Sequence, residues 1–150
     1  MINSPLIQAL PEHFDRIFNI IEENAHWLLS KDVVQWPLSW LASEKESIHQ
    51  SVIAGNYYYT GSGRETAAVV EILTGAEVLW DNDLSRTFYL HKLAVGRKYS
   101  GSGVGLRLLD EIKVRALENG VEFIRLDCVA HNIKLRDYYE HYGFKFKQVK

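Results

Sequence analysis

The chain has 150 residues, 47% of them hydrophobic, with four tryptophans and a single cysteine. This composition argues against intrinsic disorder, and the length suits one hydrophobic core, so we expect a single domain over residues 1–150. No apolar run reaches the roughly 18 residues that a membrane-spanning helix needs, and no signal-peptide pattern is present. We therefore expect a cytoplasmic protein without a membrane partner. The lone Cys128 excludes an internal disulfide and a cysteine metal cluster, and we expect no metal.

The net charge of −2 conceals two halves of opposite sign. Residues 1–83 carry 12 acidic and 4 basic side chains, a balance of −8, whereas residues 84–150 carry 7 acidic and 13 basic ones, a balance of +6. A basic half favours an anionic cofactor and an acidic half favours a cationic substrate, although ordinary solvated faces would give the same counts. With an acidic first half, nucleic-acid binding has little support.

The first half of the chain is predicted to form a short strand, two helices and a hairpin. Apolar residues recur at helical spacing through residues 12–29, and Gly55 ends a second helical pattern. The GSGR segment at 61–64 separates two strand-like runs, which predicts a hairpin. In chain order we expect a strand at 6–10, helices at 12–29 and 40–53, hairpin strands at 56–60 and 65–74, and either a short strand or an excursion at 77–81.

The second half alternates strands and helices. A strand, a long helix and another strand follow one another, which is typical of a mixed α/β sheet. Gly143 ends the last helix. The expected elements are a strand at 86–95, a helix at 102–119, a strand at 122–129, a helix at 132–142 and a closing strand at 144–149.

The most informative segment is the glycine loop SGSGVG, Ser100 to Gly105. Its three glycines leave backbone amides uncovered where a helix begins, and such a terminus favours a phosphate. A dinucleotide-binding fingerprint needs a glycine at the sixth position, where this chain has Leu106. A P-loop is excluded because no Gly-Lys-Ser/Thr follows. The loop therefore predicts a pyrophosphate site of another kind.

At this point the sequence resembles the GNAT superfamily of acetyl-CoA-dependent N-acetyltransferases. The strand LHKLAV is similar to the family's acetyl-CoA-binding strand, and the glycine loop is similar to its pyrophosphate loop. The helix and the strand FIRLDC follow in family order. The closing pattern of the family is matched at Asn132, Leu135, Tyr139, Gly143 and Phe144. Together these features are specific, whereas one alone would be weak.

The resemblance implies a GNAT-like α/β fold, in which a mixed, mostly antiparallel central sheet is splayed at the acetyl-CoA strand and flanked by about four helices. It also implies a β-bulge near the end of that strand, whose freed backbone pairs with the pantetheine arm. By position, the residues that would bind acetyl-CoA are Leu93, Ala94, Val95, Ser100, Gly101, Ser102, Gly103, Val104, Gly105 and Asn132.

Two positions depart from the family pattern. Ser100 stands where the loop starts with Arg or Gln, so the hydrogen bonds of that side chain are lost or are replaced by Arg97 or Lys98. Leu135 replaces a small residue. The amides of the three glycines remain, and we expect acetyl-CoA binding to survive.

The implied reaction transfers an acetyl group directly from acetyl-CoA to a primary amine, and it needs a base and an acid. Tyr139 fills the family's tyrosine position and is the candidate acid. His91 is the candidate base, because histidine titrates near neutral pH and serotonin N-acetyltransferases, which resemble this stretch, carry a functional histidine there. Alternation places Tyr89, His91 and Leu93 on one face if no bulge intervenes. Water relays, Glu71 or Asp127 are alternatives for the base.

The sequence does not identify the acceptor: a small polyamine-like or aromatic amine and a peptide or protein amine all agree with the resemblance. Trp27, Trp36 and Trp40 fall where this family shapes its acceptor pocket, although they would serve a core equally well. A non-catalytic acyl-CoA-binding or sensing module would keep the loop without the catalytic residues. A toxin-like enzyme acting on aminoacyl-tRNA would need a basic acceptor face. A homodimer agrees with the family, in which dimers are frequent.

Overall fold

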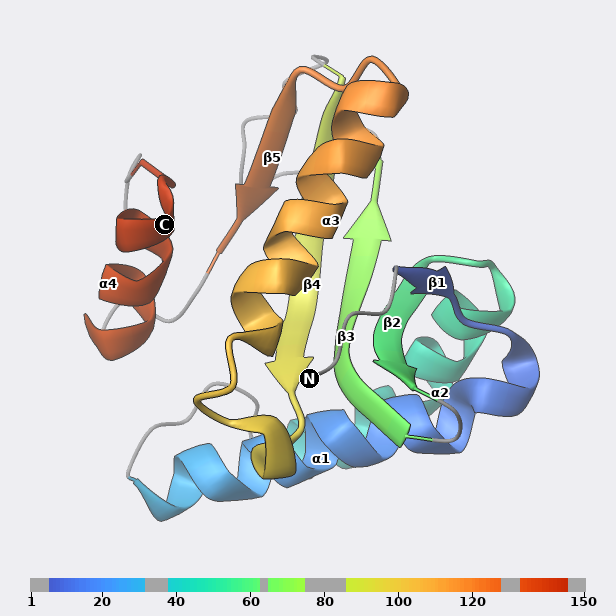
Figure 1. Ribbon diagram of the computed structural model, residues 1–150. Coiled ribbons are helices and arrows are strands. Elements are labelled where there is room, and N and C mark those ends of the chain that lie inside the picture. Colours follow the sequence, from blue (N-terminus) through green and yellow to red (C-terminus); the bar gives the residue numbers. More distant parts are fainter. Residues whose placement is uncertain (1–5, 32–37, 63–64, 75–85, 128–132, 146–150) are drawn as a thin grey trace.

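The computed structural model describes residues 6–31, 38–62, 65–74, 86–127 and 133–145. Over these ranges the chain forms one five-stranded sheet with strand order β1-β2-β3-β4-β5, covered by helices (Figure 1). The elements are β1 (Ile7–Gln8), η1 (Pro11–His13), α1 (Phe14–Ser30), α2 (Leu38–Ile53), β2 (Tyr57–Ser62), β3 (Glu65–Leu73), β4 (Thr87–Val95), η3 (Arg97–Tyr99), α3 (Val104–Glu118), β5 (Phe123–Leu126) and α4 (Ile133–Tyr142).

The sheet is mixed and mostly antiparallel, as the sequence predicts. Strands β1 to β4 pair antiparallel with their neighbours, and the predicted hairpin is formed by β2 and β3. Strand β5 lies parallel to β4 because α3 returns the chain to the same end of the sheet between them. The order and type of the predicted elements from β1 to α4 are therefore confirmed over the described residues.

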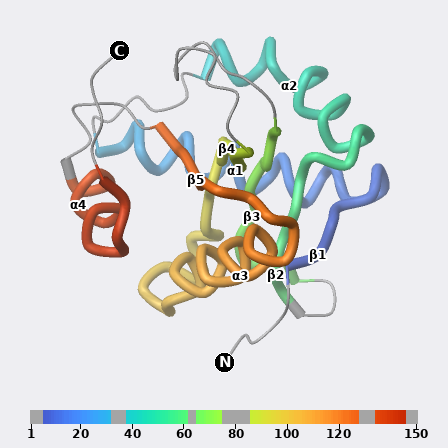
Figure 2. The backbone as a smooth tube through the Cα atoms, turned by 90° about the horizontal axis from the view of Figure 1, so that it is seen from above, coloured from blue at the N-terminus to red at the C-terminus, as the bar shows by residue number. Residues whose placement is uncertain are grey.

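Helices cover both faces of the sheet, as the view from above shows (Figure 2). The face covered by α1 and α2 buries Ile17, Ile21 and Val69, and the opposite face, covered by α3, buries Leu108 and Ile112. The spacing of the buried residues on α1 and α3 follows the helical period, which is why these two helices could be read from the sequence.

Strand β4 carries a β-bulge. Val69 pairs with Ala94 and Glu71 pairs with His91, so the single residue between the β3 partners faces two residues of β4, Lys92 and Leu93. The bulge shifts the alternation by one residue. Leu93 therefore packs against the α3 core, on the face of Leu90, while Ala94 packs against the α1–α2 core. The placement of Leu93 on the face of His91, expected for a strand without a bulge, is not what the structure has.

Several boundaries differ from the prediction. The first strand has only the two residues Ile7–Gln8. Helix α3 begins at Val104 rather than at residue 102, because Gly101 and Gly103 both have a positive φ that a helix cannot contain. Phe144 and Lys145 lie outside any strand. The predicted strand or excursion at 77–81, the remainder of the closing strand at 146–149, and Asn132 lie outside the described residues. None of the described helices is long and apolar enough to cross a membrane.

Candidate active site

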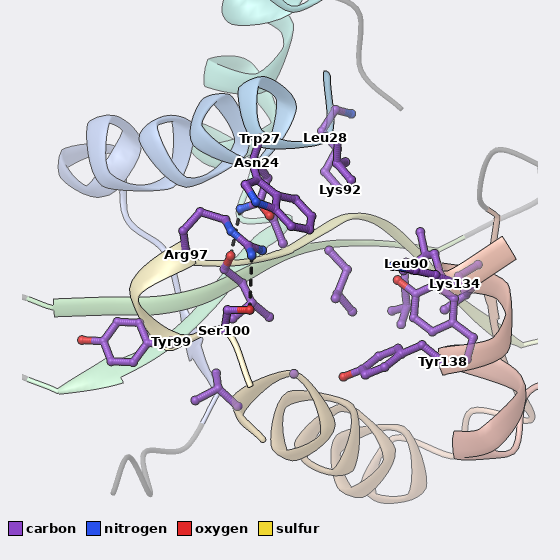
Figure 3. A pocket seen from close by; sticks show the side chains of 18 of the residues that line it. Asn24, Trp27, Leu28, Leu90, Lys92, Arg97, Tyr99, Ser100, Lys134 and Tyr138 are labelled. Carbon is purple, nitrogen blue, oxygen red and sulfur yellow. Dashed lines mark hydrogen bonds between the residues drawn. The ribbon is translucent and has the colours of Figure 1, made fainter. Parts of the chain in front are cut away.

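A cleft of about 1190 Å³ opens along β4, between α3 and α4, and continues to α1 and α2 (Figure 3). Its origin lies in the sheet. β5 ends at Leu126, which pairs with Leu90, whereas β4 runs on to Val95. The lining includes Asn24, Trp27, Trp40, His91, Lys92, Leu93, Ala94, Val95, Arg97, Ser100, Gly101, Gly103, Val104, Gly105, Asp127, Lys134, Tyr138 and Tyr139. Most of the predicted site residues thus line one cavity.

The glycine loop enters the cleft at the amino-terminus of α3. Gly101 and Gly103 have φ values of +78° and +83°, and a Cβ at either position would meet no atom within 4 Å. These two glycines are therefore required for backbone conformation and not for space. The first helical hydrogen bond runs from the Arg107 amide to the Gly103 carbonyl. The amides of residues 103–106 precede it, so they have no intrahelical acceptor and give this end of the cleft a partial positive charge.

Gly105 does have a steric role. A Cβ on this residue would lie 2.6 Å from the Tyr138 hydroxyl oxygen and 3.3 Å from Cγ2 of Val95. Tyr138 thus reaches from α4 to the first turn of α3, across the cleft, and burial raises the pKa of its hydroxyl. Tyr138 is not among the residues that the sequence predicts for the site, but it lines the cleft.

Helix α1 holds the end of β4 and the start of the loop. The buried Asn24 side-chain amide donates to the carbonyls of Ile20 and Val95, each at 2.9 Å. One position earlier, the Glu23 carboxylate accepts a hydrogen bond from the Arg97 amide. Sequence reasoning missed both residues. A signal for Asn24 was available, because it lies among the buried apolar positions of α1, where a polar side chain needs a partner.

The side chain of Arg97 is fixed inside the cleft. Its guanidinium carbon lies 3.6 Å from the centre of the Trp27 ring, and Nη2 donates to Ser100 Oγ at 3.2 Å (Figure 3). The Arg97 side chain therefore lies beside Ser100, the position at which the family has Arg or Gln. Stacking of a guanidinium on an aromatic face leaves its N–H donors available at the edge.

Lys98, the other predicted replacement, is used elsewhere. Its ammonium lies 3.1 Å from a carboxylate oxygen of Glu65, and the Tyr99 hydroxyl donates to the same carboxylate at 2.7 Å. These contacts, that of Tyr99 first, lower the pKa of Glu65. Lys98 is not among the described residues that line the cleft, so Arg97 is the better placed of the two.

The other end of the cleft contains the bulge of β4 and its neighbours. Nδ1 of His91 lies 3.8 Å from a carboxylate oxygen of Asp127, which follows β5. On the other side of β4, the Lys92 ammonium lies 3.7 Å from the carboxylate of Glu71 and 5.5 Å from the centre of the Trp40 ring. Glu71 is buried, and its carboxylate also accepts a hydrogen bond from the Ser51 hydroxyl.

Tyr139 lies on α4 and lines the cleft, but it is 7% exposed. Its ring packs edge-on against Phe144, with 5.8 Å between the centroids. Tyr142, about one turn further along α4, donates from its hydroxyl to Asp110 at 2.6 Å and so ties α4 to α3. Burial and that carboxylate raise the pKa of the Tyr142 hydroxyl.

Two ion pairs connect the acidic and the basic half of the chain. Glu65 and Glu71, from the acidic half, pair with Lys98 and Lys92 from the basic half. Among the described residues, the cleft lining has four lysine or arginine side chains and one carboxylate, that of Asp127. The acidic half therefore gives the described lining no anionic surface for a cationic substrate.

Comparison with known proteins agrees with this geometry. The sequence profile of the acetyltransferase (GNAT) family matches residues 18–144. The chain belongs to the GNAT acetyltransferase family. The uncharacterized N-acetyltransferase YesJ of Bacillus subtilis is 31% identical to this chain, with 92% of this chain and 79% of that protein covered.

Solved structures share the fold. A GNAT-family acetyltransferase from Listeria monocytogenes has a TM-score of 0.77 at 27% identity, covering 98% of this chain and 89% of that one. The PaiA N-acetyltransferase from Thermoplasma acidophilum, solved in complex with coenzyme A, has a TM-score of 0.77 at 14% identity, covering 99% and 93%. The predicted superfamily and fold are thereby confirmed, and the protein is an acyltransferase.

Proposed function

We propose that this GNAT protein transfers an acetyl group from acetyl-CoA to a primary amine by direct attack, without a covalent enzyme intermediate. The observation that carries the proposal is the edge of β4 beyond Leu90, which lines the same cleft as the amino-terminus of α3. One end of the cleft can receive an anion, and the middle offers strand backbone to an extended arm. Acetyl-CoA has these two parts in this order.

The loop end would hold the diphosphate. Amides of Gly103, Val104 and Gly105 point out of the first turn of α3, and Ser100, Gly101 and Ser102 lead into it. The stacked Arg97 guanidinium adds a charged donor with fixed geometry. This group of donors fits a phosphate without any side chain from the loop itself.

The β4 edge would hold the pantetheine arm. The Gly96 amide donates to Ala67 of β3, so by strand alternation the amide and carbonyl of Val95 face the opposite edge of β4. Beyond Leu90 this edge pairs with no strand among the described residues. Asn24 occupies that carbonyl, which leaves the Val95 amide as the donor toward the cleft. Leu93 and Ala94 complete the segment, and Asn132 stays a predicted contact by resemblance alone.

His91 is proposed as the base that takes the proton of the attacking amine. It lines the cleft beside the bulge, with 24% of its side chain exposed, and Asp127 lies close enough to Nδ1 to orient the ring. A carboxylate in this position favours one tautomer and stabilises the imidazolium that forms. The amine nitrogen then forms the new bond to the carbonyl carbon as the carbon–sulfur bond breaks.

Tyr139 is proposed as the acid that protonates the departing thiolate. Its ring is fixed by Phe144 and by the neighbouring Tyr138, and it lines the cleft from α4. For the acceptor we propose an amine with an apolar or aromatic body, because Trp40 lines the cleft at the bulge end, beside Lys92.

The test is release of free thiol from acetyl-CoA by the purified protein against a panel of aromatic, aliphatic and peptide amines. We expect turnover with at least one apolar amine. Tyr139→Phe should then lower kcat by a factor of about 10² or more and leave the Kd of acetyl-CoA unchanged, because the variant loses only the acid. Failure of the wild-type protein to bind acetyl-CoA would contradict the proposal, and an unchanged kcat in Tyr139→Phe would remove Tyr139 from it.

A further inference from the structure

Lys92 has an unusual backbone conformation. Among the residues that the structure describes, it is the single non-glycine residue with a positive φ, at +51°. A side chain with a Cβ clashes with the backbone in this left-handed region, so the conformation is unfavourable for lysine. Such outliers persist only where the surroundings enforce them, and they gather at functional sites.

The strained residue lies in the bulge of β4. Lys92 and Leu93 together face one residue of β3, and the first position of a bulge with a left-handed residue is normally glycine. Without this bulge the alternation of β4 would continue unchanged, and Leu93 and Val95 would exchange faces with Ala94. The backbone direction of the proposed cofactor-binding segment thus depends on the conformation of residue 92.

A lysine needs contacts that hold it at a positive φ, whereas a glycine would not. The side chain of Lys92 itself makes these contacts. The Lys92 side chain is 17% exposed, and its ammonium lies between the buried carboxylate of Glu71 on β3 and the Trp40 ring on α2. Removing the ammonium would leave the Glu71 carboxylate buried with Ser51 as its remaining hydrogen-bond donor among the contacts described. The contacts of the Lys92 ammonium with Glu71 and Trp40, here called the tether, therefore join β4, β3 and α2 at the bulge.

We propose that Lys92 is a positioning residue for acyl transfer: its ammonium, held between Glu71 and Trp40, keeps the β4 bulge in the conformation that presents the Leu93–Val95 backbone to the cleft. The inference rests on the proposed use of that backbone by acetyl-CoA. It assigns Lys92 no contact with the reacting atoms. The lysine fixes a backbone conformation and at the same time ties β4 to the helix that carries Trp40.

The test compares three substitutions that separate the charge from the backbone. Lys92→Met keeps the Cβ and the length but loses the tether, so the Kd of acetyl-CoA should rise about tenfold, which corresponds to the cost of a left-handed conformation for such a residue. Lys92→Gly also loses the tether but adopts the positive φ without strain, so its Kd should return to within about threefold of wild type. Lys92→Arg keeps the charge and should behave like wild type.

Lys45→Met is the matched control. Lys45 lies on α2 with its ammonium 5.1 Å from the Phe18 ring, and it is not among the described residues that line the cleft. We expect an unchanged Kd. A purely stabilising role of Lys92 would lower Tm in all tether-free variants and leave the Kd of the folded protein unmoved. That result, or a Lys92→Gly variant as weak as Lys92→Met, would overturn the proposal.

Two further measurements keep the test independent of other failures. If Lys92→Met does not fold, Lys92→Met combined with Glu71→Gln removes the uncompensated buried carboxylate and is measured instead. NMR scalar couplings report the φ of residue 92 in the cofactor-free protein: we expect a positive φ in wild type and Lys92→Gly and its loss in Lys92→Met. A positive φ retained in Lys92→Met would refute the role of the Lys92 side chain, whether or not the protein binds acetyl-CoA. Failure of the wild-type protein to bind acetyl-CoA would instead refute the proposed function.

Discussion

The two ends of the cleft are built in different ways. The loop end is a continuous segment from Arg97 to Gly105, in which backbone amides are the main donors and two glycines set the conformation. The bulge end brings together side chains from four elements: Trp40 on α2, Glu71 on β3, His91 and Lys92 on β4, and Asp127 after β5. The kind of groups at each end agrees with the chemistry proposed for that end.

A phosphate is recognised by many donors at fixed positions, and a helix terminus supplies them within one turn. Proton transfer needs a few side chains whose charges are set by neighbours, and those neighbours come from elsewhere in the chain. The loop end should therefore respond to mutation mainly in cofactor affinity, and His91, the proton-transfer group of the bulge end, mainly in kcat. The following predictions test this division, from the largest expected effect to the smallest.

The largest effect is expected at His91. His91→Gln keeps hydrogen-bonding capacity but removes the base, so kcat/KM for the amine should fall by a factor of about 10²–10⁴ while the Kd of acetyl-CoA stays unchanged. Steady-state kinetics and calorimetric titration of acetyl-CoA measure the two quantities. His26→Gln, an exposed histidine on α1, is the control and should leave both unchanged. A parallel loss of cofactor affinity would show that the two ends are not separable.

Arg97 tests the loop end. Arg97→Met should weaken acetyl-CoA binding about tenfold or more, because a hydrogen bond to a charged group contributes ~1.5–3 kcal/mol, and the loss should shrink at high salt. Lys98→Met, whose exposed pair with Glu65 lies outside the described lining, should change the Kd by less than about threefold. Equal effects of the two variants would contradict the distinct role given to Arg97. Calorimetric titration at low and high salt makes the comparison.

The smallest effect is expected at the joint between α1 and β4. Asn24→Ala removes two hydrogen bonds from a buried side chain and leaves the Val95 carbonyl without this donor, so the free energy of unfolding should fall by about 1–3 kcal/mol. Denaturant titration measures the loss, with the exposed Asn19→Ala on the same helix as control. The Kd of acetyl-CoA should change less than it does in Arg97→Met. A larger change would make α1 part of the cofactor site.

The sequence alone determined the order of the elements, the mixed sheet and the loop end of the cleft. These features rest on local signals: helical periodicity in α1 and α3, and glycines at positions where the chain must adopt a positive φ. The resemblance carried by the same residues led to the correct family. Where the local signal was ambiguous, at the first residues of α3, the boundary was wrong by two positions.

Only the tertiary structure decided how the halves meet. The contact from Asn24 to Val95 spans 71 positions, and no local pattern could pair them. The same holds for Arg97 on Trp27, for His91 beside Asp127, and for Glu65 and Glu71 of the acidic half, which pair with Lys98 and Lys92 of the basic half. The bulge was expected by resemblance, but its residue was not, because lysine disfavours a positive φ. Contacts between distant residues supply the energy that overrides that local preference.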